Sequence, residues 1–147
     1  MPAVAATPNV VHVIQLAVAP VFLLSGVGVI LTVLTNRLAR IIDRARLLED
    51  RLHGEPDERR AQMLTEMDLL AHRAWMVNLA LTLATSCALL VCLVIALLFL
   101  GSAMRIDMDT VISVMFVSGM AALVGSLSIF LREIYLGTAQ LRIGRRK

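Results

Sequence analysis

The chain of 147 residues is 59% hydrophobic and only 17% charged, whereas a typical soluble domain carries about 25% charged residues. Its mean hydropathy is +0.82, and its formal net charge is +3. The missing charge is concentrated in three runs without any acidic or basic side chain, residues 1–36, 74–104 and 110–131. Each run is long enough to cross a hydrocarbon layer of about 30 Å, so the composition excludes an ordinary soluble domain and indicates a membrane protein with three spans.

The first predicted element is a transmembrane helix at residues 10–36, which follows a short tail at residues 1–9. The apolar run is too long for the core of a cleavable signal peptide, and no basic residue precedes it. Pro20 removes a backbone donor from the helix interior, which predicts a kink near Leu16 to Pro20.

The second element is a helical hairpin at residues 37–74, continuous with the spans on both sides. Apolar side chains recur at alternating spacings of three and four on each arm, first at Leu38, Ile41, Ala45, Leu48 and Leu52, then at Leu64, Met67, Ala71 and Ala74. This spacing is typical of a coiled-coil contact. Between the arms, Gly54 suits the end of one helix and Pro56 the start of the next.

Four arginines of the first arm fall within about 60° around the helix axis, beside its apolar row: Arg37, Arg40, Arg44 and Arg51. Three interpretations remain open for this stripe. The first is pairing with the eight acids of the hairpin, such as Arg44 with Glu66 or Asp68. The second is contact with anionic lipid headgroups, and the third is contact with a partner protein or a nucleotide. Nucleic acid is not expected, because the hairpin carries no net charge and no aromatic side chain for stacking.

Two further spans are predicted at residues 75–104 and 110–131, joined by a short loop at residues 105–109 and followed by a basic tail at residues 132–147. Small side chains mark the places where membrane helices touch. The third span contains them at a spacing of four, at Ser118, Ala122 and Ser126, and the second span has a similar row at Ala80, Ala84 and Ala88. We therefore predict close packing of the spans along these rows.

The distribution of basic residues predicts the orientation. Thirteen lie in the connection 37–73 and the tail, and only Arg105 lies on the other side. Basic residues favour the cytoplasmic side, so the hairpin and the C-terminus should be cytoplasmic and the N-terminus outside.

Polar side chains along the first span form a further stripe with two interpretations. Gln15, Ser25, Thr32 and Asn36 recur at a roughly heptad spacing, with Phe22 among them. They suit hydrogen bonds between helices, and in a symmetric oligomer they would line a pore.

The sequence contains no motif of an enzyme or of a cofactor site. There is no metal-binding or nucleophile motif and no glycine-rich phosphate loop, and His12, His53 and His72 are expected at different depths. We therefore expect no catalytic residue, no cofactor and no metal site.

Residues 13–49 resemble the signature of a bacterial membrane-protein family, domain of unknown function number 2721. The resemblance is clearest in "APVFLL" at residues 19–24 and in "NRLARIIDRAR" at residues 36–46. It implies three spans and a bacterial inner-membrane location, and it implies no activity. The sequence thus predicts an all-α, multi-pass, self-associating membrane protein whose cytoplasmic hairpin docks on its own copies, a partner or lipid headgroups. The alternative is a homo-oligomeric pore or ion channel lined by the first span.

Overall fold

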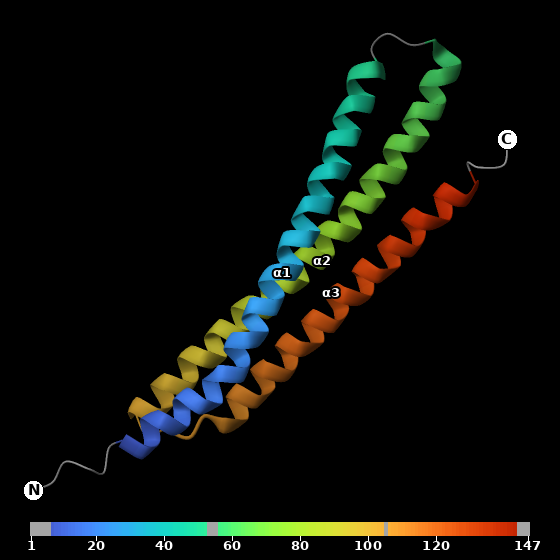
Figure 1. Ribbon diagram of the computed structural model, residues 1–147. Helices are drawn as coiled ribbons and strands as arrows, with labels where there is room; N and C mark the ends of the chain where they lie inside the picture. The colour runs from blue at the N-terminus through green and yellow to red at the C-terminus, as the bar shows by residue number, and fades with distance from the viewer. Residues whose placement is uncertain (1–6, 53–55, 105, 144–147) are drawn as a thin grey trace, which may run out of the picture. The chain divides into compact units, whose positions relative to one another are not determined.

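The computed structural model describes residues 7–52, 56–104 and 106–143, and the regular structure of this part is entirely helical. Helix α1 spans Thr7–Leu52, α2 spans Asp57–Met104 and α3 spans Asp109–Ile143 (Figure 1). All three are long and apolar enough to cross a membrane. The protein is therefore an all-α protein with three candidate membrane spans, as its composition predicted.

Helices α1 and α2 continue from apolar into charged sequence without a break. Helix α1 passes through Pro20, which lies inside the helix and is buried, and continues to Leu52. Helix α2 begins after Pro56, whose carbonyl accepts hydrogen bonds from the backbone N–H groups of Arg59 and Arg60, both at 3.1 Å. Proline suits this place because the first residues of a helix have no partner for their N–H groups. Gly54, the predicted end of the first arm, lies outside the described residues.

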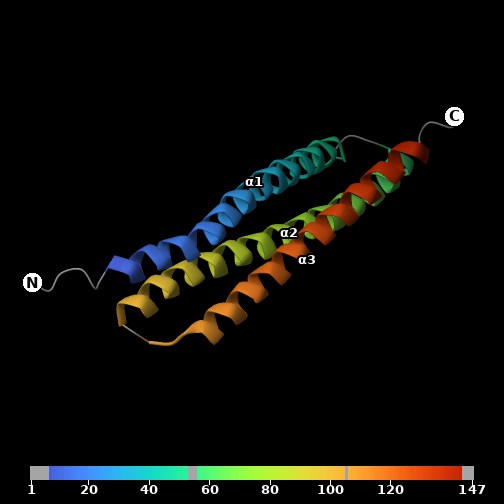
Figure 2. The same ribbon diagram turned by 60° about the horizontal axis from the view of Figure 1, so that its bottom comes forward.

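The connection between α2 and α3 is short (Figure 2), and it contains a backbone hydrogen bond and a side-chain hydrogen bond. The N–H of Ile106 donates to the carbonyl of Gly101 at 3.2 Å. Asp107 Oδ1 accepts the backbone N–H of Asp109 at 3.2 Å, as a side chain does at the N-terminus of a helix. The chain can thus reverse direction within a few residues.

The described residues divide into two compact units, and each helix contributes to both. The first unit comprises the part of α1 up to Ile30 together with Leu83–Val124. The second comprises Leu31–Thr82 and the part of α3 from Gly125 onward. In the second unit α2 has a neighbour on two sides: Glu66 pairs with Arg44 of α1, and the Ala80 carbonyl accepts a hydrogen bond from Ser126 of α3.

Burial along α1 follows a seven-residue repeat. The buried side chains are separated by three, four or seven positions: Val13, Ala17, Pro20, Val27, Leu34 and Ile41. Leu38, Ala45, Leu48 and Leu52 continue the same row and are partly buried. The row predicted for the first arm of the hairpin therefore lies on the buried or partly buried side of α1, and it continues the row that starts at Val13.

The row predicted for the second arm is wrong in part. Leu64 and Ala71 are exposed, Met67 and Ala74 are partly buried, and the buried side chain of this segment is Leu70. The reason is that α2 packs against both α1 and α3 in this unit. A helix with two neighbours buries a wider face than one row of side chains. A row predicted for contact with a single helix therefore includes side chains that are exposed and misses Leu70, which is buried.

Candidate functional site

Glu133 of α3 is a buried carboxylate in an apolar protein. It is 1% exposed, and it is the only acidic residue after Asp109. Burying an ionised carboxylate costs several kcal/mol unless charged partners and hydrogen bonds compensate for the lost water. The surroundings of Glu133 supply such partners.

Two arginines from two other helices bind the two oxygens of Glu133. Arg73 of α2 donates from Nη2 and Nε to Oε1, at 2.7 and 3.2 Å. Arg37 of α1 donates from Nη1 to Oε2. One carboxylate therefore joins all three helices of the second unit, and we call Arg37, Arg73 and Glu133 the Glu133 cluster.

Neighbouring residues of α3 support this cluster. The guanidinium carbon of Arg37 lies 5.2 Å from the centre of the Phe130 ring, a distance at which the ring attracts a cation. Two turns before Glu133, the hydroxyl of Ser126 donates to the carbonyl of Ala80 at 2.7 Å, and Ser126 is fully buried. Ser126, Phe130 and Glu133 are spaced by four and three, so they lie on one face of α3.

The charges of the Glu133 cluster do not cancel. Two guanidinium groups and one carboxylate leave a formal charge of +1. The side chain of Glu133 is 1% exposed, but those of Arg37 and Arg73 are 39% and 29% exposed. The carboxylate is thus buried between the helices, whereas part of each arginine side chain is exposed on the protein surface.

The other arginines of the predicted stripe separate into two kinds. Arg44 binds Glu66 Oε1 through Nη2 at 2.6 Å and Nε at 3.2 Å, one of the pairs predicted from the register of the hairpin. Arg40 and Arg51 have exposed side chains. Among the residues that the structure describes, internal pairing therefore uses Arg37 and Arg44 of the stripe, although the partner of Arg37 is on α3 rather than in the hairpin.

The polar stripe of α1 lies on the exposed side of the helix. Gln15, Ser25, Thr32 and Asn36 are all exposed, and Ser25 donates to the carbonyl of Val21 at 3.3 Å. At 100° per residue the centre of the stripe is about 180° from the buried row. The stripe therefore faces away from α2 and α3, and it does not belong to the packing within one chain.

The small-residue row of α3 is buried at only part of its length. Ser126 is buried and Ala122 is partly buried, but Ser118 is exposed and donates to the carbonyl of Val114 at 2.8 Å. Gly119 is buried in its place, and a β-carbon there would lie 3.5 Å from Leu90 Cβ. A spacing of four drifts by about 40° per step, whereas a spacing of seven drifts by only about 20°, so the contact follows the seven-residue spacing.

Replacing Ser126 by alanine is expected to lower the free energy of unfolding by about 1 kcal/mol, because a buried interhelical hydrogen bond is lost. Ser118→Ala is the matched control, since Ser118 is exposed and bonds within its own helix. Thermal unfolding of both variants in detergent tests this expectation. Equal effects of the two substitutions would contradict the assigned role of Ser126.

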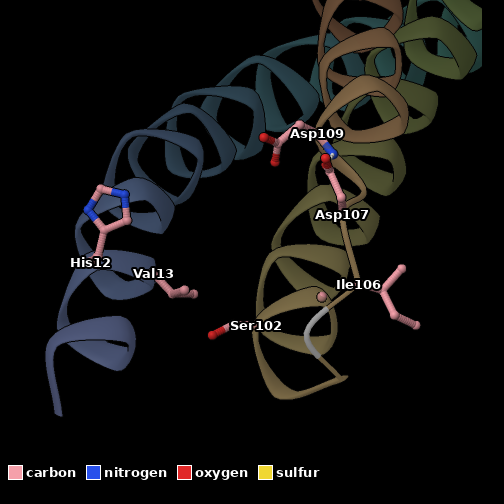
Figure 3. Close-up of a pocket in the computed structure, with 7 residues that line it drawn as sticks. His12, Val13, Ser102, Ile106, Asp107 and Asp109 are labelled. Atoms are coloured by element: carbon pink, nitrogen blue, oxygen red, sulfur yellow. Dashed lines mark hydrogen bonds between the residues drawn. The ribbon is translucent and has the colours of Figure 1, made fainter. Parts of the chain in front are cut away.

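An open pocket of about 370 Å³ lies in the first unit, lined by His12, Val13, Gly101, Ser102, Ile106, Asp107 and Asp109 (Figure 3). His12 comes from α1, and the two aspartates come from the start of α3 and the connection before it. Among the described residues no group of three or more His, Cys, Asp or Glu side chains is placed to hold a metal ion.

Comparison with known proteins identifies the family. A family model described as "Protein of unknown function (DUF2721)" matches residues 17–143. The chain belongs to the DUF2721 family. The match includes Arg37, Arg73 and Glu133. No curated protein and no solved structure matches the chain.

The sequence patterns did not identify Glu133 as a site residue. The third span was predicted to end at Leu131, which placed Glu133 at the start of a basic tail. Two signals were present in the sequence: Glu133 is the only acid after Asp109, and it lies seven residues after Ser126. A lone acid on the packing face of a span requires a basic partner, so these signals together point to a buried ion pair.

Proposed function

We propose that this DUF2721 protein is a non-enzymatic, self-associating protein of the bacterial inner membrane. Its N-terminus lies outside, its hairpin and C-terminus lie in the cytoplasm, and the exposed face of α1 binds a second copy of the chain. The observation that carries this proposal is the polar stripe of Gln15, Ser25, Thr32 and Asn36, which is exposed on a single chain.

The physical argument rests on the two amide side chains. Gln15 and Asn36 are 21 residues apart, which is roughly 32 Å along a helix, about the thickness of the hydrocarbon layer. Amide groups that face lipid tails lose their hydrogen bonds to water, and polar side chains in membranes therefore favour contacts with other helices. A second copy brings its own amide side chains to this face, where they can bond to Gln15 and Asn36 near the two ends of the span.

The hairpin offers a second contact for another copy. A cavity of about 290 Å³ lies between α1 and α2 in the second unit, with a mainly apolar lining and with Arg46 and Glu49 as its charged residues. Ala45, Ala71 and Ala74 contribute small side chains to it. Such a cavity suits an apolar side chain from the hairpin of a second copy. Across a two-fold axis, Arg46 of each copy would face Glu49 of the other.

Cysteine crosslinking in membranes tests self-association through α1. In a background with Cys87→Ala and Cys92→Ala, Val29→Cys places a thiol within the stripe, and Val117→Cys places one on α3. Both valines are 66% exposed, so the two positions are matched in accessibility. We expect oxidation to give disulfide-linked dimers from Val29→Cys and few from Val117→Cys. Equal crosslinking at both positions, or a monomeric mass of the native protein in mild detergent, would contradict the proposal.

A pore lined by α1 is the second candidate, and the continuity of the stripe favours it. The stripe runs from Gln15 to Asn36, and the exposed Arg40 follows one turn later. In a closed ring of copies these groups would line a polar path with arginines at its cytoplasmic mouth. Purified protein in planar bilayers should then conduct, and Asn36→Leu and Gln15→Leu should change the conductance. Silent bilayers containing oligomeric protein would remove this candidate and leave the binding role.

A further inference from the structure

The Glu133 cluster lies where all three helices change from apolar to charged sequence. Arg37 is the first charged side chain of the chain, and Arg73 is the last before a run of 31 uncharged residues. Arg132 and Glu133 follow directly after the uncharged run 110–131. Because hydrocarbon excludes charged side chains, these three transitions mark the surface of the membrane, where phospholipid phosphates lie.

Two exposed aromatic residues mark the same level. Trp75 is two residues after Arg73 and is 61% exposed, and its ring stacks on His72 at 6.4 Å. Tyr135 is two residues after Glu133 and is 71% exposed. Tryptophan and tyrosine favour the interface between hydrocarbon and headgroups, so their positions agree with the charge transitions.

Within the described part of the chain, Glu133 does not use all the N–H donors of the two arginines of the cluster. A guanidinium group has five N–H donors, and Glu133 accepts from Nε and Nη2 of Arg73 and from Nη1 of Arg37. Both side chains are partly exposed, at 29% and 39%. They are also fixed, since Glu133 holds both and the Phe130 ring lies against Arg37. Arginines held in place lose less conformational entropy when they bind a further anion.

The charge around the cluster attracts an anion. The cluster itself has a formal charge of +1, and the exposed Arg40 and Arg132 lie within one turn of it along α1 and α3. We propose that Arg37 and Arg73 form a binding site for the phosphate of an anionic phospholipid headgroup, with Glu133 as the positioning residue that aims them. This site adds Arg73 to the arginines of the sequence stripe and does not use Arg44, which pairs with Glu66. The inference rests on the membrane-spanning arrangement and does not require self-association.

Lipid binding to the full-length protein tests the site. Native mass spectrometry of the protein in mild detergent compares phosphatidylglycerol with phosphatidylcholine of the same chain length. We expect a preference for phosphatidylglycerol that falls about fivefold in Arg37→Gln and in Arg73→Gln, since an interfacial arginine contributes about that factor. Arg51→Gln is the matched control, because Arg51 is an exposed arginine of the same helix 14 residues away. It should leave the preference unchanged.

Several results would overturn the site. An equal loss in Arg51→Gln would show general attraction by positive charge, and equal binding of the two lipids by the native protein would show no headgroup site. Displacement of phosphatidylglycerol by millimolar inorganic phosphate would assign the site to a free anion. If a glutamine variant fails to fold, Arg37→Lys can replace it, because lysine keeps the positive charge but lacks the planar guanidinium group with its paired donors. This variant should lower the preference for phosphatidylglycerol about two- to threefold. Crosslinking at Val29→Cys should be unaffected in Arg73→Gln, so failure of the lipid site and failure of self-association are separate outcomes.

Discussion

Replacing Glu133 by alanine is expected to lower the free energy of unfolding by about 3–5 kcal/mol, a large part of the stability of a small domain. The substitution removes the common partner of Arg37 and Arg73. Two partly exposed guanidinium groups then lie close together without a counter-charge, and the buried place of the carboxylate is left empty. Thermal unfolding in detergent, followed by the fluorescence of Trp75, the only tryptophan of the chain, measures the effect close to the cluster.

The control for this prediction is Glu66→Ala. Glu66 also pairs with an arginine, but its side chain is 43% exposed and that of Arg44 is 65% exposed, so the loss should stay below about 1 kcal/mol. Equal losses from the two substitutions would show that Glu133 is not buried as described. A triple substitution, Arg37→Met, Arg73→Met and Glu133→Leu, should recover most of the stability, because it leaves no charge without a partner. It should still remove the preference for phosphatidylglycerol.

Replacing Ala84 by leucine is expected to destabilise the first unit by about 3 kcal/mol. Ala84 is fully buried in the middle of α2, and small side chains at such places let membrane helices approach closely. A leucine there needs space that the neighbouring helices occupy, so side chains or backbones must move. The unfolding temperature in detergent measures the effect.

Ala96→Leu is the matched control for this second prediction. Ala96 lies on the same helix 12 residues later and is exposed, so a larger apolar side chain should change stability by at most about 0.5 kcal/mol. A small effect of Ala84→Leu would mean that the helices separate easily at this point, and the tight contact assigned to Ala84 would be wrong.

Much of the fold follows from patterns that are local in the sequence. The three uncharged runs predicted three long apolar helices, because spanning length and charge exclusion depend only on consecutive residues. The row from Leu38 to Leu52 predicted the buried face of the first arm, because the periodicity of a helix places those side chains on one side. The same reasoning was less successful for Leu64 and Ala71, since α2 has two neighbours and the sequence does not state how many helices surround a segment.

The candidate site could not be derived in this way. The sequence placed Arg37 correctly beside the apolar row, but its partner lies 96 residues away, and Arg73 lies 60 residues from the same carboxylate. Nothing in the spacing of the hairpin indicates that α3 reaches the level of Arg37. The sequence predicted Arg44 with Glu66 or Asp68, because an antiparallel register of the two arms brings these residues to the same level, and the structure has the pair with Glu66.

The sequence by itself determined the three apolar helices, the row from Leu38 to Leu52 and the position of the charge boundaries, because each depends on the periodicity and polarity of one continuous segment. Only the tertiary structure decided that Glu133 is buried, that Arg37 and Arg73 share it, and that the polar stripe of α1 faces outward. The physical reason is that a charged side chain takes its role from the groups at its own level on neighbouring helices. That level is set when the three helices pack, and no single segment encodes it.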